Sequence, residues 1–318
     1  MNAAVLFIRR HRVAAVIAFL IVFPLLMPYQ ALAINILIFG LFAVGFNLLF
    51  GYTGLLSFGH AAFLGVGSYL TGISMVHGAV PWLLALLIGV LSAAAAGLVI
   101  GYLAIRTRGI YFSMVTLALA QIVYYAFYKA ERWTGGENGL RGIQVPAFEL
   151  MGTGITVDFL NPVTKYYVIL VFVALALWAV SRLLASPFGA VIEAVRENEQ
   201  RAAACGFDVA RTKLLVFVIS AAVCGLAGGL RALHLSVVPI DSLHYLQSGQ
   251  AVMMCLLGGM GTFFGPFIGA GLFLTLEDVA TTLTTHWMAI VGAVFMVFVL
   301  YFPAGVWGTL MKRLERTA

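Results

Sequence analysis

The chain has 318 residues, of which 63% are hydrophobic and only 9% are charged, and its mean hydropathy is +1.05. A soluble domain has too little interior for so much apolar surface, so the composition excludes a soluble globular protein and predicts a polytopic membrane protein. A net charge of +6 suggests nucleic-acid binding only in a soluble chain; here we expect a lipid bilayer and no nucleic acid as partner, because basic residues mark the cytoplasmic ends of membrane helices.

Apolar runs of membrane-spanning length follow one another along most of the chain. No Asp, Glu, Lys or Arg stands between Val13 and Ile105, which is enough for several crossings of about 20 residues each. The first run follows Arg9, Arg10 and Arg12 and resembles a signal peptide, but no small-residue cleavage pattern follows it, so we predict an uncleaved first crossing. We predict one all-α transmembrane domain over 1–318 with about ten segments, two of them short, at 13–29, 31–50, 55–74, 80–104, 109–128, 166–185, 213–231, 249–260, 264–276 and 286–303.

The distribution of basic residues predicts an orientation. The polar stretch at 186–212 has an excess of basic side chains around it, whereas the loop at 129–165 balances basic against acidic ones. By the positive-inside rule, 186–212, Arg106, Arg108 and both chain ends are cytoplasmic and the loop at 129–165 is periplasmic. The first group of five crossings then starts inside and the last group of five starts outside, the parity of an inverted repeat, although the halves show no convincing sequence match.

The polar stretch at 186–213 is predicted to form one short surface helix, or two in succession. Pro187 suits a helix entrance, Asn198 an internal cap and Gly206 a C-terminal cap. Val191, Ala194 and Val195 recur at helical spacing and would form one modest apolar ridge beside crowded charges. The alternative interpretation is a solvated connector between two membrane helices.

Two glycine-rich stretches, at 51–60 and 258–266, interrupt the apolar pattern. Glycine lets the backbone leave helical geometry, and unwound backbone at membrane depth is tolerated only where protein buries it or a watery cavity meets it. One interpretation is a broken helix beside a translocation path; the other is a tight cytoplasmic turn with close helix packing. The candidate path residues are Asn47, Gly51, Thr53, Gly54, Ser57, His60, Gly258, Gly259 and Gly261.

The remaining polar features restrict the function classes. A turn-rich stretch at 134–143 is either a docking surface for an external partner or an ordinary exposed loop. The sequence contains no zinc pattern, phosphate loop, nucleophile elbow or paired intramembrane carboxylates, so a membrane enzyme, a metal site and an autonomous ATPase are all disfavoured. Charged residues are almost absent from the predicted crossings, which argues against ion coupling. Two classes survive: a permease subunit driven by a separate ATPase, and a self-contained facilitator or secondary carrier.

Five motifs, taken in order, resemble the LivM-type permease of branched-chain amino-acid ABC importers. They are GYTGLLSFGHAAF at 51–63, TGGENGL at 134–140, AVRENE at 194–199, LGGMGT at 257–262 and FPAGVWG at 302–308. The resemblance implies a non-catalytic permease of the bacterial inner membrane, with a helical bundle similar to that of vitamin B12-type importers. Its implied partners are a homologous LivH-type permease, two cytoplasmic ATP-binding subunits and a periplasmic substrate-binding protein. ATP would be used by those partner subunits, and this chain would bind no cofactor.

The resemblance also assigns roles to particular residues. The segment at 194–206 matches the region that inserts into the ATPase, and the candidate coupling residues are Val191, Glu193, Ala194, Val195, Arg196, Glu197, Asn198, Glu199 and Gly206. The candidates for docking the binding protein are Thr134, Gly135, Gly136, Glu137 and Asn138. Because exposed charge pairs contribute only about 0–1 kcal/mol, removal of Glu199 is expected to be mild.

The resemblance leaves the cargo open. Family members often carry a basic residue where Ala304 stands. Permeases with the same motifs are thought to serve leucine, isoleucine and valine, but also urea, amides and aromatic acids. The motifs therefore indicate the transport machine and not its solute.

Overall fold

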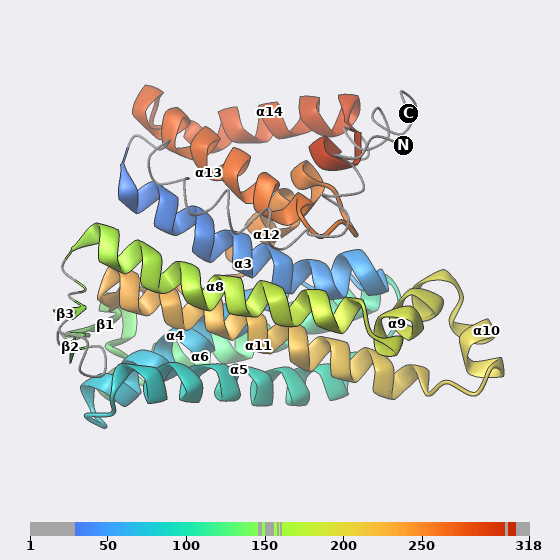
Figure 1. Cartoon of the computed structure of the whole chain (residues 1–318), viewed down its shortest axis with the longest axis horizontal. Coiled ribbons are helices and arrows are strands. Elements are labelled where there is room, and N and C mark those ends of the chain that lie inside the picture. The colour runs from blue at the N-terminus through green and yellow to red at the C-terminus, as the bar shows by residue number, and fades with distance from the viewer. Residues whose placement is uncertain are drawn as a thin grey trace.

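The computed structural model describes residues 29–145, 148–149, 156–157, 159, 161–302 and 305–309. These residues form a bundle of long helices that run between two opposite ends of the molecule (Figure 1). The long helices are α3 (Gln30–Thr53), α4 (His60–Val76), α5 (Trp82–Ala104), α6 (Ile110–Lys129), α8 (Pro162–Leu184), α11 (Val209–Leu235), α12 (Tyr245–Gly258), α13 (Gly265–Leu283) and α14 (Trp287–Tyr301). The short elements lie at the ends of these helices: α7 (Glu131–Thr134), η2 (Gly136–Asn138), β1 (Leu140–Arg141), β2 (Phe148–Glu149), β3 (Thr156–Val157), α9 (Pro187–Glu197), α10 (Glu199–Ala204), β4 (Val237–Val238) and η3 (Ile240–Leu243).

Seven of the described helices are long and apolar enough to cross a membrane: α3, α5, α6, α8, α11, α13 and the helix that begins at Trp287. Helices α4, with 17 residues, and α12, with 14 residues, are shorter. Each predicted segment from 31–50 onward coincides with a helix in the predicted order. The segment predicted at 13–29 lies outside the described residues, apart from its last one.

The predicted lengths were wrong at two places. The run at 55–74 is helical only from His60, because Gly54 adopts a left-handed φ of 76° and ends α3 there. The run at 264–276, predicted to be short, continues as α13 to Leu283. Helix α13 includes Glu277 and Asp278, which are only partly buried, and the Asp278 carboxylate accepts the Tyr29 hydroxyl.

Helix starts follow local capping chemistry. Asn161 precedes α8, and its side-chain oxygen accepts the Val163 amide at 3.0 Å, while Pro162 occupies the first helical position. Asp208 caps α11 in the same way, through the Arg211 amide at 3.0 Å.

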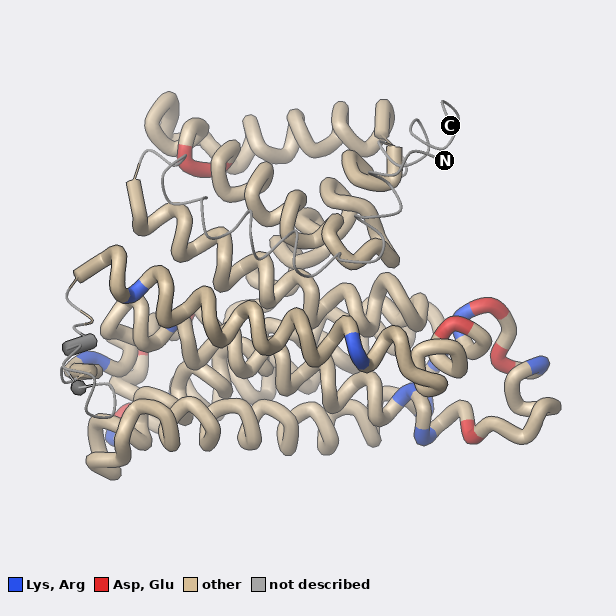
Figure 2. The backbone as a smooth tube through the Cα atoms, in the orientation of Figure 1, with Lys and Arg blue, Asp and Glu red and all other residues tan. Residues whose placement is uncertain are grey.

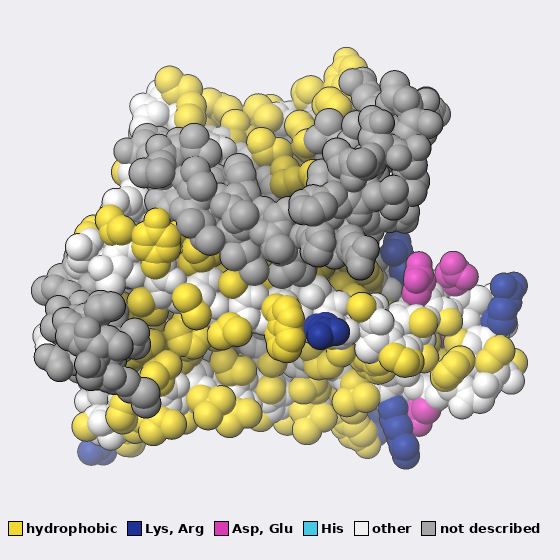
Figure 3. Space-filling model, in the orientation of Figure 1, with side chains coloured by type: hydrophobic (Ala, Val, Ile, Leu, Met, Phe, Trp, Pro, Cys, Tyr) yellow, Lys and Arg dark blue, Asp and Glu magenta, His cyan; other side chains and the backbone are white. Residues whose placement is uncertain are grey.

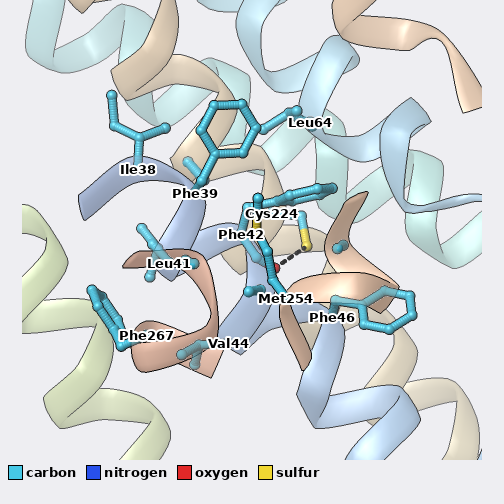
Figure 4. Packing of buried hydrophobic residues seen from close by; sticks show 14 of the residues in the cluster. Ile38, Phe39, Leu41, Phe42, Val44, Phe46, Leu64, Cys224, Met254 and Phe267 are labelled. Carbon is cyan, nitrogen blue, oxygen red and sulfur yellow. Dashed lines mark hydrogen bonds between the residues drawn. The ribbon is translucent and has the colours of Figure 1, made fainter. Parts of the chain in front are cut away.

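Helix α3 is the centre of the bundle. It packs against α8, α11, α12 and α13, and its buried phenylalanines meet side chains from α11 and α12 (Figure 4). Cys224 and Cys255 are fully buried among these apolar groups, and Cys224 Sγ donates to the Phe42 carbonyl at 3.7 Å. Cys205 is exposed.

Close helix approach depends on glycine. A Cβ atom built on Gly228 of α11 would lie 1.9 Å from the carbonyl oxygen of Leu64 on α4. Ser68 Oγ donates to the Gly228 carbonyl at 2.7 Å, across the same contact. Small residues at such interfaces let two backbones pack directly, as is common between membrane helices.

The outer surface is apolar along the helices and charged at their ends. Large hydrophobic side chains such as Leu91, Val99 and Ile122 are 59%, 62% and 64% exposed, and such side chains cover the visible side of the lower helices (Figure 3). Most Lys, Arg, Asp and Glu residues gather near the two ends of the bundle (Figure 2). This distribution is that of a multi-pass membrane protein whose helix surfaces face lipid.

We call the end that carries α9 the α9 end and the opposite one the β1 end. The β1 end contains the turn at 77–81, residues 130–145 and the turn at 236–244: β1 pairs with β4 in antiparallel register, and the rings of His77 and Trp133 lie 5.4 Å apart. The α9 end contains the turns at 54–59, 105–109 and 259–264 (Figure 1). The described residues of 130–145 and the stretch at 186–212 thus lie at opposite ends of the bundle.

Candidate functional site

Helices α9 and α10 form a compact pair at one end of the bundle, which we call the α9–α10 pair (187–204). Pro187 is the first residue of α9. Asn198, in an extended conformation, ends α9 and caps α10 by accepting the Arg201 amide at 2.9 Å. Gly206 follows α10 with φ at 88°. The two helices, the predicted helix entrance at Pro187 and the two predicted caps at Asn198 and Gly206 are confirmed.

The predicted apolar ridge of α9 is partly turned inward. Gly189, Ile192 and Val195 form the buried face of α9, and Val195 is only 2% exposed. This face packs on α3, α8 and α11. A helix docked on three others buries the residues at its contact, so Val195 is unavailable to a partner protein, whereas Val191 and Ala194 remain partly exposed.

The outward face of the pair is charged and polar. Glu193, Arg196, Glu197, Asn198 and Gln200 are exposed. Glu199 is different, because its Oε1 lies 2.5 Å from Lys213 Nζ of α11, and the Lys213 side chain is 8% exposed. The sequence-based expectation of a freely exposed Glu199 was therefore wrong.

Both glycine-rich stretches lie in turns at the α9 end, which we call the glycine turns (54–59 and 259–264). The first connects α3 to α4, and the second connects α12 to α13. Asn47 of α3 holds the second turn to α3: its Nδ2 donates to the Thr262 carbonyl at 3.0 Å, and its Oδ1 accepts the Gly261 amide at 3.1 Å. A Cβ atom on Gly51 would lie 2.0 Å from Asn47 Oδ1 and 2.6 Å from the Gly261 nitrogen, so glycine is required for this contact.

The predicted path residues in these turns mostly hold helices together. His60 is fully buried, its Nε2 lies 2.8 Å from Ser220 Oγ, and its ring lies against Phe46 and Phe63. Thr53 Oγ1 donates to the Leu49 carbonyl, and Ser57 accepts the Gly59 amide. These contacts show close packing beside the turns, and the role of these residues in a translocation path stays a prediction.

Gly305 and Trp307 of the tail motif lie against the second glycine turn. A Cβ atom on Gly305 would lie 2.4 Å from Gly259 Cα, and the ring of Trp307 lies 5.5 Å from that of Phe264. Sequence reasoning did not connect the tail with the second glycine turn. The shared signal is glycine at both positions, Gly259 and Gly305, each with a positive φ.

At the β1 end, the predicted docking residues divide into two groups. Thr134 is buried, and its Oγ1 donates to the carbonyls of Phe127 and Ala130; Gly136 is also buried. These two residues hold their own loop together and offer no side-chain surface to a partner. Gly135, Glu137 and Asn138 are exposed.

Within the described residues, no group of three or more His, Cys, Asp or Glu side chains is placed to hold a metal ion. The two salt bridges found there are Glu199–Lys213 and Asp208–Arg211, both beside the α9–α10 pair. The α9–α10 pair therefore presents a charged surface to the outside and is packed on several long helices.

Comparison with known proteins identifies relatives. The family described as "Branched-chain amino acid transport system / permease component" matches residues 29–300. The high-affinity branched-chain amino acid transport system permease protein LivM of Salmonella typhimurium is 30% identical over 290 residues, covering 85% of this chain and 68% of that protein. LivM of Escherichia coli (strain K12) is 29% identical with the same coverage. The corresponding LivH permease of Salmonella typhimurium is 26% identical over 286 residues, covering 85% of this chain and 91% of that protein. No solved structure matches the chain.

Proposed function

Because the chain belongs to the family of branched-chain amino acid transport permease components, we propose that its α9–α10 pair is the surface to which separate ATPases bind. The chain is a permease subunit of an ABC importer and not itself an enzyme. Such a subunit has no motor of its own, so it must offer the motor a contact that is rigid enough to transmit movement.

The observation that carries the proposal is the way the α9–α10 pair is built. Its buried face, with Ile192 and Val195, is docked on three long helices, while its outer face presents Glu193, Glu197 and Gln200. A solvated connector needs neither the caps at Asn198 and Gly206 nor a buried contact with the bundle. A docked helix with a charged outer face fits a protein partner whose surface has complementary charges.

We propose the following orientation of the chain in the membrane and the following assembly of the transporter. The α9 end faces the cytoplasm and the β1 end the periplasm, in the inner membrane, with both chain ends cytoplasmic and about ten crossings. Two cytoplasmic ATP-binding subunits sit below, and a homologous LivH-type permease completes the path in a bundle similar to vitamin B12-type importers. A periplasmic substrate-binding protein docks at the β1 end, where Glu137 and Asn138 are exposed.

For the cargo, we propose branched-chain amino acids or a related small polar solute. The names of the relatives support this choice. Urea, amides and aromatic acids remain the alternatives within the same machine. Purifying the binding protein that associates with the complex, and measuring by calorimetry which of these solutes it binds, decides between them.

The test of the coupling role is to break α9. A proline in a helix interior costs roughly 3 kcal/mol and removes a backbone hydrogen bond, so Ala194→Pro should leave the protein in the membrane but abolish uptake and substrate-stimulated ATP hydrolysis. Ala194→Ser, which keeps the backbone amide, is the matched control. A purified Ala194→Pro complex that still couples substrate delivery to hydrolysis would rule the proposal out.

A further inference from the structure

Arg196 of α9 extends across both glycine turns of its own chain. It follows Ile192 by four residues and therefore lies at the edge of the buried face of α9. A Cβ atom built on Gly54 would lie 3.9 Å from Arg196 Cγ, and one built on Gly261 would lie 3.0 Å from Arg196 Nη1. The aliphatic part of the side chain passes the first turn, and the guanidinium reaches the second.

The guanidinium lies beside the carboxyl end of α3. The same Cβ position on Gly261 is 3.1 Å from the Gly51 carbonyl oxygen, which belongs to the last turn of α3. Carbonyls in the last turn of a helix carry partial negative charge and attract a cation. Among the described residues, neither salt bridge involves Arg196, so backbone, not a carboxylate, surrounds its charge within the chain.

The second glycine turn (259–264) is itself connected to several helices. Asn47 holds it to α3 with two hydrogen bonds, Gly305 of the tail packs on Gly259, and the turn itself joins α12 to α13. A displacement of Arg196 therefore acts on a segment that four other parts of the chain share. Motion passes between sites through such contiguous contacts when the parts are rigid.

We propose that Arg196 is a positioning residue that transmits movement of α9 to the two glycine turns, and through Gly261 and Asn47 to α3, α12 and α13. The inference rests on the proposed role of α9 as the ATPase contact. It assigns Arg196 a role inside the permease, in place of the predicted ion pair with the motor.

The experiment uses the complete complex of both permeases and the ATPases, reconstituted in liposomes with the binding protein. We expect Arg196→Gln to assemble and to keep hydrolysing ATP, while solute transported per ATP falls at least about fivefold, the lower range of ordinary coupling between sites. Arg196→Lys should recover part of the ratio, because it keeps a cation at the end of α3. Arg108→Gln, which removes an exposed charge from the turn at 105–109, outside the α9–α10 pair, is the control and should leave the ratio unchanged.

A second variant tests the route independently. Gly261→Ala places a methyl group against Arg196 Nη1 at a φ of 70°, so it should also lower the amount of solute transported per ATP. If both residues act on one route, the double variant Arg196→Gln/Gly261→Ala should be no worse than the more affected of the two single variants. Gly292→Ala, where a Cβ meets nothing within 4 Å, is the matched control.

Two outcomes would overturn the inference. One is that Arg196→Gln behaves like Arg108→Gln, and the other is that the ATPases no longer co-purify with Arg196→Gln, which would make Arg196 a contact with the ATPase. Ala194→Pro, measured in parallel, separates these results from a failure of the proposed function: if it too transports normally, α9 is not the coupling element at all.

Discussion

Glu199 Oε1 and Lys213 Nζ lie 2.5 Å apart and tie the start of α10 to the start of α11. The Lys213 side chain is 8% exposed and that of Glu199 41% exposed. The pair is thus intermediate between a surface pair, which contributes about 0–1 kcal/mol, and a buried pair, whose disruption costs about 3–5 kcal/mol. The Glu199–Lys213 ion pair therefore holds helices α9 and α10 against α11.

We predict that Glu199→Ala is destabilising, because it leaves a mostly buried ammonium group without its carboxylate. The expected cost is about 1–3 kcal/mol, measured as a lower thermal unfolding midpoint of the purified protein in detergent. Glu197→Ala, at an exposed neighbour, is the control and should have little effect. Replacing Lys213 with Met as well should restore part of the loss; equal midpoints for Glu199→Ala and Glu197→Ala would contradict the prediction.

A second prediction concerns the orientation of the two ends. Asn138 and Asn198 are both exposed and lie at opposite ends of the bundle. In a background without Cys205, the one exposed cysteine among the described residues, a membrane-impermeant thiol reagent applied to intact cells should label Asn138→Cys and spare Asn198→Cys. After lysis both should react. The reverse pattern in intact cells would invert the topology that the basic residues predict.

A third prediction is that uptake does not draw on a proton or sodium gradient. Ion coupling needs a charged or multiply coordinating site in the middle of a crossing, whereas Lys213 stands near the start of α11 and Arg231 near its end, and Glu277 and Asp278 stand in the last two turns of α13. Uptake into cells should therefore survive an uncoupler as long as the ATP level is maintained. Collapse of uptake at constant ATP would favour a self-contained secondary carrier.

A fourth prediction tests the α4–α11 contact. Gly228→Ala places a Cβ atom 1.9 Å from the Leu64 carbonyl oxygen, and backbone on both sides cannot move cheaply. Overpacking of this kind costs about 1–3 kcal/mol, so the unfolding midpoint in detergent should fall. Gly292→Ala, with open space around it, should be neutral or slightly stabilising, because alanine favours the helix. Similar midpoints for the two variants would mean that α4 and α11 separate easily.

Local features of the α9–α10 pair could be predicted from sequence, and its packing could not. Caps depend on a few neighbouring residues, so Pro187, Asn198 and Gly206 sufficed to place the helix ends. Which face of α9 is buried depends on three helices distant in the chain, and this is why Val195 was assigned to the wrong side.

The sequence also did not indicate that several motifs meet at the α9 end. Asn47 and Thr262 are 215 residues apart along the chain, yet they are joined by a hydrogen bond. Hydropathy finds apolar runs and glycine marks their interruptions, but neither indicates which interruptions meet. The turns at 54–59 and 259–264 were therefore left with two interpretations, and their common proximity to Arg196 became visible only in the structure.

The antiparallel pairing of β1 with β4 also affects how the protein is made. Leu140 is opposite Val238, and α8, the α9–α10 pair and α11 are all synthesised between them. At ordinary rates of about 5–20 residues per second, the first strand stays unpaired for on the order of ten seconds after it leaves the ribosome. During that interval residues 140–141 lack their partner strand at the β1 end, so this pairing forms only after α11 has been synthesised.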